Sequence, residues 1–416
     1  MPFESASRAY AALADFRRRR ERQIDFTFGR QWNDTVTYQG RSMTEATLCE
    51  KKGTRPLVNN LIRQLVKTVT GRMRQRLMQE RERTAEDGDP IAAVRRTNSL
   101  DELDSRLFEE FLISGSAVQR IVAERRPSGT GVWVDNVDPS RFFTNRFCDP
   151  RGCDIELAGM IHDMSFSELA GRFGRGTAGV DGLRRLYGAG GAMPGVFGNA
   201  PSGRCRVVEV WTLDSDAEGR LTWMCRWYSP DGSLIDVYPS PWAHGSHPFA
   251  VKLYPLTAGE VHSLVDDVIC QQKAVNRLTT LIDHVIGTSA KGALLFPIGQ
   301  LAEGWTMDDV AAQWATPDGV IPYNGLSRLP LPQQIVTTKE PSSAYHLLEM
   351  ELRLMQQVSG VSDALSGRQS AGSGNSAALY EAQLNASTVA LLDTFAAFDA
   401  FRESRDAKIV NLFAMR

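Results

Sequence analysis

The side chains best suited to catalysis are scattered along this 416-residue chain rather than gathered in a known motif. Asp266 and Asp267 form the clearest acidic pair. Neighbouring positions on a helix diverge by about 100°, so these two carboxylates would not readily share one substrate atom or metal ion. His244 and His247 lie beside Pro248 without a nearby Cys or carboxylate ligand, which favours a surface turn over a metal site.

A glycine-spaced loop resembles a phosphate site but lacks the required chemistry. Gly287 and Gly292 have the spacing of a phosphate-binding loop, whereas Ala293 and Leu294 stand where Lys and Ser or Thr are needed. The sequence has no HExxH or GxSxG motif, and its six cysteines show neither a CxxC pair nor zinc-type spacing. We therefore expect no enzyme, no catalytic residues, no metal and no cofactor.

Composition and charge further restrict the class of protein. The formal net charge is -2, although residues 1–100 carry 20 Lys and Arg against 12 Asp and Glu, a net charge of +8. A near-neutral chain does not grip nucleic-acid phosphates over its whole surface. No apolar run approaches the roughly 18 residues of a membrane span, and the N-terminus lacks a signal peptide. We expect a soluble, intracellularly made protein with reduced thiols and no membrane partner.

Two long amphipathic helices organise the chain. The first is expected over 260–286, where apolar residues recur every three or four positions, and the second over 342–358. The polar face of the first helix is too hydrophilic for the core of a monomer. We expect the following residues of this face to contact neighbouring copies: Asp266, Asp267, Gln271, Lys273, Asn276 and Arg277. A ring of identical copies would bury the apolar faces through one repeated head-to-tail contact.

The remaining patterns predict an α+β protein. Helices are expected over 4–26, over 58–82 and over 90–123 with a break near 113–117, followed by short strands between 118 and 240 and a short helix at Phe166–Phe173. A small β-rich lobe with one short helix is expected between the two long helices. The Ser-, Gly- and Asn-rich stretch after the second helix predicts an exposed loop, and a further helix from about 375 to the end.

Several passages, taken in order, resemble the portal proteins of tailed bacteriophages, most closely those of short-tailed phages (podoviruses). FGRQWNDTV followed by RPLVNNLIRQLVKTVTGRMRQ is similar to the opening region of that family. VDPSRFFTNRFCDPRGCDIELAGMIHDMSFSEL resembles its wing segment, and HGSHPFAVKLYPLTAG the approach to its stem helix. VSGVSDALSGRQSAGSGNSAALYEAQ resembles its tunnel loop. The resemblance covers nearly the whole chain.

The resemblance implies a portal-type division of the chain. The wing would occupy 1–258, the stem helices 259–287 and 341–359, the clip 288–340, the tunnel loop 360–376, and a long helix toward the wing or crown 377–416. The given sequence ends at Arg416, so the crown that usually follows in that family is either absent or lies beyond this sequence.

The resemblance also implies a function and partners. The protein would be a dodecameric ring at one capsid vertex of the virion, assembled in the host cytoplasm, through which double-stranded DNA passes during packaging and ejection. The implied partners are the terminase large subunit, a tail adaptor and the major capsid protein.

The tunnel loop carries the residues that we expect to face DNA: Ser366, Gly367, Arg368, Gln369, Ser370, Ser373 and Asn375. A mostly uncharged lining suits sliding, because each neutralised phosphate adds affinity. Arg368 would touch phosphates transiently, and a solvated loop residue is the alternative for this position. Two other functions remain open: a nucleic-acid-processing enzyme that uses the basic N-terminal region, and a head–tail connector or adaptor without a DNA channel.

Overall fold

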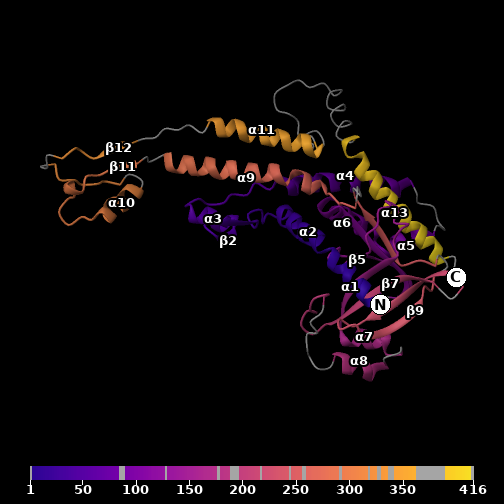
Figure 1. Cartoon of the computed structure of the whole chain (residues 1–416). Coiled ribbons are helices and arrows are strands. Elements are labelled where there is room, and N and C mark those ends of the chain that lie inside the picture. The colour runs from indigo at the N-terminus through magenta and orange to yellow at the C-terminus, as the bar shows by residue number, and fades with distance from the viewer. Residues whose placement is uncertain are drawn as a thin grey trace, which may run out of the picture. The chain divides into compact units, whose positions relative to one another are not determined.

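The computed structural model describes residues 2–83, 90–126, 129–175, 179–187, 196–215, 218–242, 245–254, 259–289, 293–316, 319–325, 329–335, 342–361 and 389–413. The chain divides into two compact units, which are considered separately (Figure 1). The larger unit contains Met1–Gln31, Asn60–Cys270 and Met355–Arg416. The smaller unit contains Trp32–Asn59 and Gln271–Leu354.

The larger unit contains two antiparallel sheets. The five-stranded sheet has the order β5-β6-β7-β8-β9, formed by Phe142–Thr144, Leu157–Met164, Cys205–Ser215, Leu221–Tyr228 and Leu234–Pro239. The three-stranded sheet has the order β10-β3-β4, formed by Phe249–Leu253, Ser116–Arg126 and Gly129–Asn136. The predicted strands between 118 and 240 are therefore present, and the mixed α/β class is confirmed.

The helices of the larger unit correct two of the sequence predictions. The expected helix over 4–26 is divided into α1 (Pro2–Ala12) and α2 (Ala14–Thr27), because the chain turns at Leu13. Tyr10 of α1 packs on Phe143 and Phe197. The expected helix over 90–123 is α5 (Pro90–Asn98) and α6 (Leu100–Ser114), separated by Ser99 in the left-handed conformation. The other helices are α4 (Leu61–Arg83), α7 (Phe166–Phe173), α8 (Gly179–Tyr187) and α13 (Leu392–Phe413).

The largest hydrophobic core of this unit lies between helices α4, α6 and α13. The ring of Phe108 stacks on Phe395 at 5.6 Å and meets Phe398 edge-on at 5.0 Å. These rings are almost completely buried, and each contributes on the order of 2 kcal/mol to stability. Apolar residues at the start of α9 and the end of α11 join the same cluster, namely Val265, Val268, Ile269 and Met355. The two long helices are thereby anchored in the larger unit.

The smaller unit is built around the long helices. It contains a hairpin of β1 (Thr35–Tyr38) and β2 (Arg41–Thr44), followed by α3 (Glu45–Lys51). Helix α9 (Leu264–Ser289) enters it from the larger unit, and α11 (Ser342–Ser359) leaves it. Between them lies a lobe with β11 (Ala293–Leu295), a 3-10 turn (Ile298–Gln300), α10 (Met307–Ala315) and β12 (Gln333–Ile335). The predicted short helix of this lobe is α10, whereas the described strands of the predicted β-rich lobe, β11 and β12, are only three residues long each.

Helix α9 begins and ends later than the sequence predicts. Its first turn is fixed by Ser263, whose hydroxyl accepts a hydrogen bond from the Asp266 N–H at 3.0 Å and so satisfies one of the free N–H groups of that turn. At the other end the helix continues through Gly287 to Ser289. The predicted end at residue 286 was three residues too early, since a glycine inside a helix costs only about 1 kcal/mol and does not stop it.

Candidate functional site

The polar face of α9 carries a stripe of three buried residues, Gln272, Asn276 and Thr280, spaced four positions apart. This spacing places all three side chains on one side of the helix. In the smaller unit the stripe is covered by a short segment of the same chain, residues 55–59, which we call the strap. The strap reaches the stripe through the backbone of Leu57 and Asn59.

The hydrogen bonds between strap and stripe are regular. The Leu57 N–H donates to Thr280 Oγ1 at 3.1 Å, and the Asn59 N–H donates to Asn276 Oδ1 at 3.2 Å. The side-chain amide of Gln272 donates to the Asn59 carbonyl at 2.6 Å and to Asn276 Oδ1 at 3.0 Å. A non-regular backbone segment thus finds partners on the helix side chains, as buried polar groups require.

Two cations of α9 lie beside this stripe and bind acidic residues of the hairpin region. Lys273 Nζ lies 2.6 Å from Asp34 Oδ2 and 2.9 Å from Glu45 Oε1. Arg277 Nη2 lies 2.9 Å from the same Glu45 oxygen. The Lys273 and Glu45 side chains are 18% and 8% exposed, so solvent screens this contact less than it screens a surface pair. Together these contacts fix residues 34–59 along the middle of α9.

The remaining predicted contact residues lie nearer the start of α9. Asp266 accepts a hydrogen bond from the Gln23 side-chain amide at 2.6 Å. Partial burial, followed by the charge of Asp266, raises the pKa of Asp267 above its ordinary value. Gln271 Oε1 is buried without a hydrogen-bond partner among the described residues.

The structure therefore gives Asp266, Lys273, Asn276 and Arg277 partners within their own chain. Their predicted contacts with neighbouring copies stay a prediction. Gln272 and Thr280 were not among the predicted site residues. Their spacing of four positions from Asn276 does indicate that they lie on the same face of the helix. The tunnel-loop residues from Ser366 to Asn375 lie outside the described residues.

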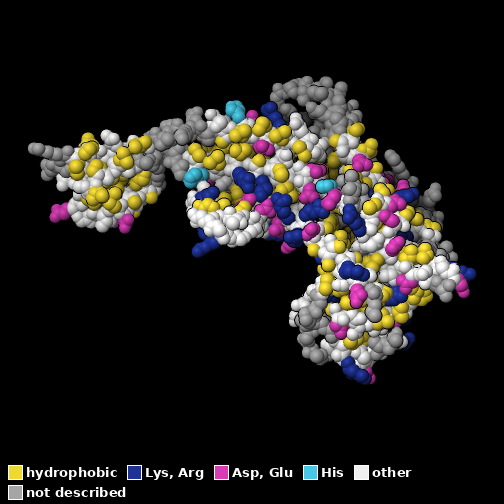
Figure 2. Space-filling view, viewed as in Figure 1, with side chains coloured by type: hydrophobic (Ala, Val, Ile, Leu, Met, Phe, Trp, Pro, Cys, Tyr) yellow, Lys and Arg dark blue, Asp and Glu magenta, His cyan; other side chains and the backbone are white. Residues whose placement is uncertain are grey.

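Large apolar side chains remain on the outside of both long helices. On α11, Tyr345, Leu347 and Met350 are each 47% exposed, and on α9 Leu281 and Ile286 are about half exposed. Figure 2 shows hydrophobic side chains gathered over this part of α11. Clustered apolar residues in water mark surfaces that contact other molecules. Several polar side chains of α9 have partners within the chain, whereas apolar side chains of α9 and α11 remain exposed.

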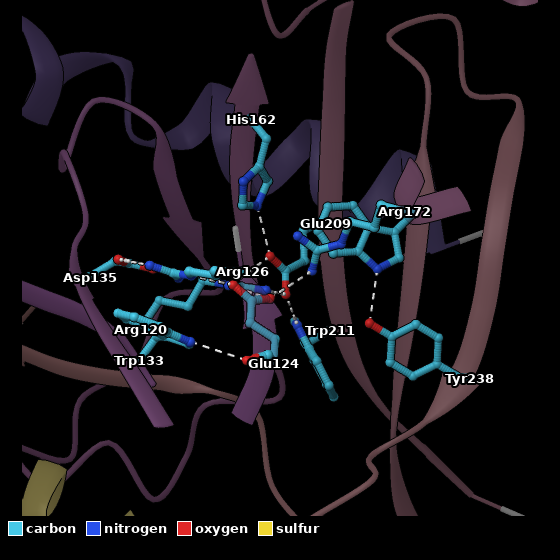
Figure 3. Close-up of polar contacts among 11 residues, drawn as sticks. Arg120, Glu124, Arg126, Trp133, Asp135, His162, Arg172, Glu209, Trp211 and Tyr238 are labelled. Atoms are coloured by element: carbon cyan, nitrogen blue, oxygen red, sulfur yellow. Dashed lines mark hydrogen bonds and ion pairs between the residues drawn. The ribbon is translucent and has the colours of Figure 1, made fainter. Parts of the chain in front are cut away.

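A second polar cluster lies in the larger unit around the fully buried Glu209 (Figure 3). Arg120 Nε donates to Glu209 Oε2 at 3.0 Å, Trp211 Nε1 donates to Oε1 at 2.8 Å, and His162 Nε2 lies 2.7 Å from Oε2. Burial alone would raise the pKa of Glu209, but the nearby Arg120 charge and the His162 hydrogen bond outweigh it and hold the pKa below its usual range. Burial also lowers the pKa of His162.

This cluster borders an open pocket of about 1260 Å³. Two arginines at its rim are paired: Arg126 binds Asp135 and Glu124, and Arg172 binds Glu124 while it stacks over Trp227. A general acid or base needs a pKa near the working pH, whereas Glu209 is held ionised. The arrangement connects the two sheets, because Arg120 of β3 binds Glu209 of β7.

The long helices of this α+β protein carry large apolar side chains that are exposed in the single chain. A family model described as phage P22-like portal protein matches residues 4–405. The chain belongs to the P22-like portal protein family. No curated protein matched the chain at a significant level.

Membership of this family makes the chain a homo-oligomeric, capsid-associated protein of a phage virion, located at a capsid vertex. The family is structural rather than enzymatic. None of the helices in the described part of the chain combines the length and apolar character needed to cross a membrane.

Proposed function

We propose that this chain forms a closed dodecameric ring at a unique capsid vertex and serves as the channel for genome packaging and ejection. The observation that carries this proposal is that the polar and the apolar faces of the long helices have different surroundings. The polar stripe of α9 is bound by the strap of the same chain, which leaves Leu281, Tyr345 and Met350 exposed. A head-to-tail contact between copies would bury these residues, and repetition of that contact closes a ring.

In this proposal, the polar loop over 360–376 lines the path of the DNA. Its Ser, Gly, Gln and Asn residues carry no charge, so they would release few counterions and let DNA slide. Arg368 would form a thin ring of charge that touches phosphates transiently. This contact is independent of DNA sequence, because phosphates carry no base information.

Helix α13 follows this loop in the chain and is firmly fixed in the larger unit. Arg405 is fully buried and its Nη1 lies 2.5 Å from Asp104 Oδ1, while Arg402 Nη2 lies 2.9 Å from Glu80 Oε2. Breaking a buried pair of this kind costs about 3–5 kcal/mol. In the proposed ring, α13 would hold the C-terminal end of the loop in place while DNA moves past it.

The lobe between the long helices would provide the docking site for the terminase large subunit and, later, the tail adaptor. The larger unit would contact the major capsid protein. Exposed apolar residues of the lobe, such as Ile298 at 74% and Val320 at 78%, support a role in binding other chains.

DNA packaging into procapsids of the same phage, assembled with this protein, tests the proposal. We expect nuclease-protected DNA inside particles that contain the wild-type chain. Particles assembled with Met350→Glu should lose it, because a charge would enter the contact between copies. The matched control Leu221→Glu changes a 66% exposed apolar residue of β8 and should package normally. Equal packaging by both variants, or metal-dependent cleavage of DNA by the purified protein, would contradict the proposal.

A further inference from the structure

The open pocket beside Glu209 is larger than a site for a single small molecule. Its volume is about 1260 Å³, whereas pockets for small ligands measure about 300–1,000 Å³. It lies within the larger unit, and its walls come from β3 and β4 of one sheet, from β6, β7 and β9 of the other, and from α7. A pocket of this size has room for an extended segment of polypeptide.

Aromatic and sulfur-containing side chains provide the apolar surface of this pocket. Trp242 stacks on Trp211 with ring centroids 5.1 Å apart, and Tyr238 meets Trp211 edge-on at 6.3 Å. Trp242, Tyr238 and Met160 line the pocket and are only partly buried. Trp, Tyr, Arg and Met are the residue types enriched where proteins bind one another. The composition therefore favours a protein partner over a small metabolite.

Arginines outnumber carboxylates in the lining. The pocket is lined by four carboxylate side chains and by five arginines, namely Arg120, Arg125, Arg126, Arg141 and Arg172. The Glu124 carboxylate is shared by three of these arginines, with Arg126 at 2.9 Å, Arg172 at 3.6 Å and Arg120 at 3.9 Å (Figure 3). Because each guanidinium carries five N–H donors, one carboxylate does not satisfy all three.

Three of the guanidinium groups keep donors for a further acceptor. Arg125 is exposed, and neither a hydrogen bond nor an ion pair joins it to the part of the chain that the structure describes. Arg172 meets its carboxylate partner at 3.6 Å, which is too long for a hydrogen bond. Arg206 holds both oxygens of Asp163 at 2.8 and 2.9 Å, so Arg141 is left with a contact of 3.2 Å to that carboxylate.

We propose that this pocket binds an extended segment of another polypeptide in which acidic side chains flank a large apolar one. The acidic side chains would accept hydrogen bonds from Arg125, Arg141 and Arg172, since charge-assisted pairs of this kind are strong and directional. The apolar side chain would pack on Trp242 and Tyr238. The carboxylates of the lining would repel the closely spaced phosphates of a nucleic acid, whereas a segment with separated acidic groups avoids them. One copy of the chain forms the whole pocket, so this site is independent of the ring in the proposed function.

Calorimetric titration of the purified chain with synthetic peptides tests this inference. The probe is a peptide with one tryptophan flanked by glutamates, and the matched control carries lysine at every glutamate position. We expect the glutamate peptide to bind at least about tenfold more tightly than the lysine peptide. Similar affinities, or no binding of the glutamate peptide, would overturn the inference. Displacement of the bound peptide by double-stranded DNA would assign the pocket to nucleic acid and would also contradict it.

A matched pair of variants locates the binding site. Arg125→Glu reverses an exposed charge of the pocket, and Arg220→Glu reverses a charge outside it on a side chain that is 78% exposed. Both positions are exposed, so both variants should fold. Arg125→Glu should weaken binding of the glutamate peptide at least about tenfold, and Arg220→Glu by less than about twofold. Equal effects of the two substitutions would show that the peptide binds elsewhere and would overturn the inference.

Chemical modification of arginine gives a second readout on the unaltered chain. Phenylglyoxal reacts with accessible guanidinium groups, and mass spectrometry identifies the modified residues. With the glutamate peptide bound, Arg125 and Arg141 should react more slowly, while Arg220 should react as in the free protein. Unchanged reactivity of Arg125 and Arg141 under saturating peptide would contradict the inference.

Discussion

Asn276 accepts a hydrogen bond at 3.2 Å from the backbone N–H of Asn59, a residue 217 positions earlier in the chain. The contact ties the strap to the middle of α9. Because Gln272 donates to both Asn59 and Asn276, the three groups form one network. This part of the polar face is therefore covered within the single chain.

Replacement of Asn276 by alanine should destabilise the smaller unit. The change removes the acceptor for the Asn59 N–H and a partner of Gln272, so we expect a loss of about 1–2 kcal/mol in unfolding free energy. Denaturant unfolding measures the loss. Asp283→Ala, at an exposed position of the same helix, is the control and should change stability little. Equal effects of the two substitutions would show that the strap contact contributes nothing.

Replacement of Glu209 by glutamine should cost about 3–5 kcal/mol at pH 7, because it leaves the Arg120 guanidinium buried without its main counter-charge. Glu218→Gln changes a side chain that is 71% exposed and should be nearly neutral. Thermal unfolding of the two variants and the wild type measures these differences in stability.

The cost of Glu209→Gln should also depend on pH. The pKa of Glu209 is lowered in the folded state, so its contribution is fully present above the unfolded value of about 4.5 and is lost as pH falls below it. The stability difference between wild type and variant should therefore shrink between pH 5 and pH 3, by on the order of 1 kcal/mol or more. A difference that stays constant over this range would contradict the lowered pKa.

Replacement of Lys408 by methionine should stabilise the protein at neutral pH. Burial lowers the pKa of Lys408 to about 8, and its ammonium donates to the His247 carbonyl at 2.8 Å. Between pH 8 and 10.5 the unfolded chain holds this proton while the folded chain has released it, so the contribution to stability rises with pH. We expect Lys408→Met to gain about 1–2 kcal/mol at pH 7 and to lose this advantage near pH 10.

Lys252→Met is the matched control for Lys408, since Lys252 Nζ also donates to a backbone carbonyl, that of Pro150, but in an exposed position. Its unfolding free energy should differ from wild type by only a few tenths of a kcal/mol at either pH. A Lys408→Met protein that is less stable than wild type at pH 7 would show that the hydrogen bond to His247 outweighs the burial of the charge.

Replacement of Gly115 by alanine should disturb the junction that precedes α9. Gly115 has φ of 72°, and an added Cβ would lie 2.6 Å from the Tyr254 carbonyl oxygen and 2.7 Å from that of His262. Gly53 also has φ of 72° but has open space around it. Both alanines carry the backbone strain of about 1 kcal/mol, and Gly115→Ala should cost at least about 1–3 kcal/mol more from the clash. Equal melting temperatures for the two variants would contradict this packing.

Local periodicity predicted much of the fold. The helix at Phe166–Phe173 and the second long helix agree with the structure to within a residue at each end. Here the apolar spacing and the flanking Ser165, Gly174 and Gly360 act over a few residues, so the sequence alone contains the signal. The break at Ser99 was missed because no Gly or Pro marks it.

The candidate site was only partly predictable for a different reason. Gln272, Asn276 and Thr280 share a helix face that spacing reveals, but their partners Leu57 and Asn59 are more than 200 residues away in the chain. A polar face exposed to another copy and one covered by a distant strap look the same in sequence. The wide polar face of α9 predicted contacts with neighbouring copies, and it could not reveal the contacts within the chain that the structure also contains.

Native mass spectrometry of the purified chain tests the central claim most directly. The exposed apolar faces of α9 and α11 predict that the 46.0 kDa chain assembles into a single closed oligomer, a dodecamer, at micromolar concentration. A protein that remains a 46.0 kDa monomer under these conditions would contradict the account.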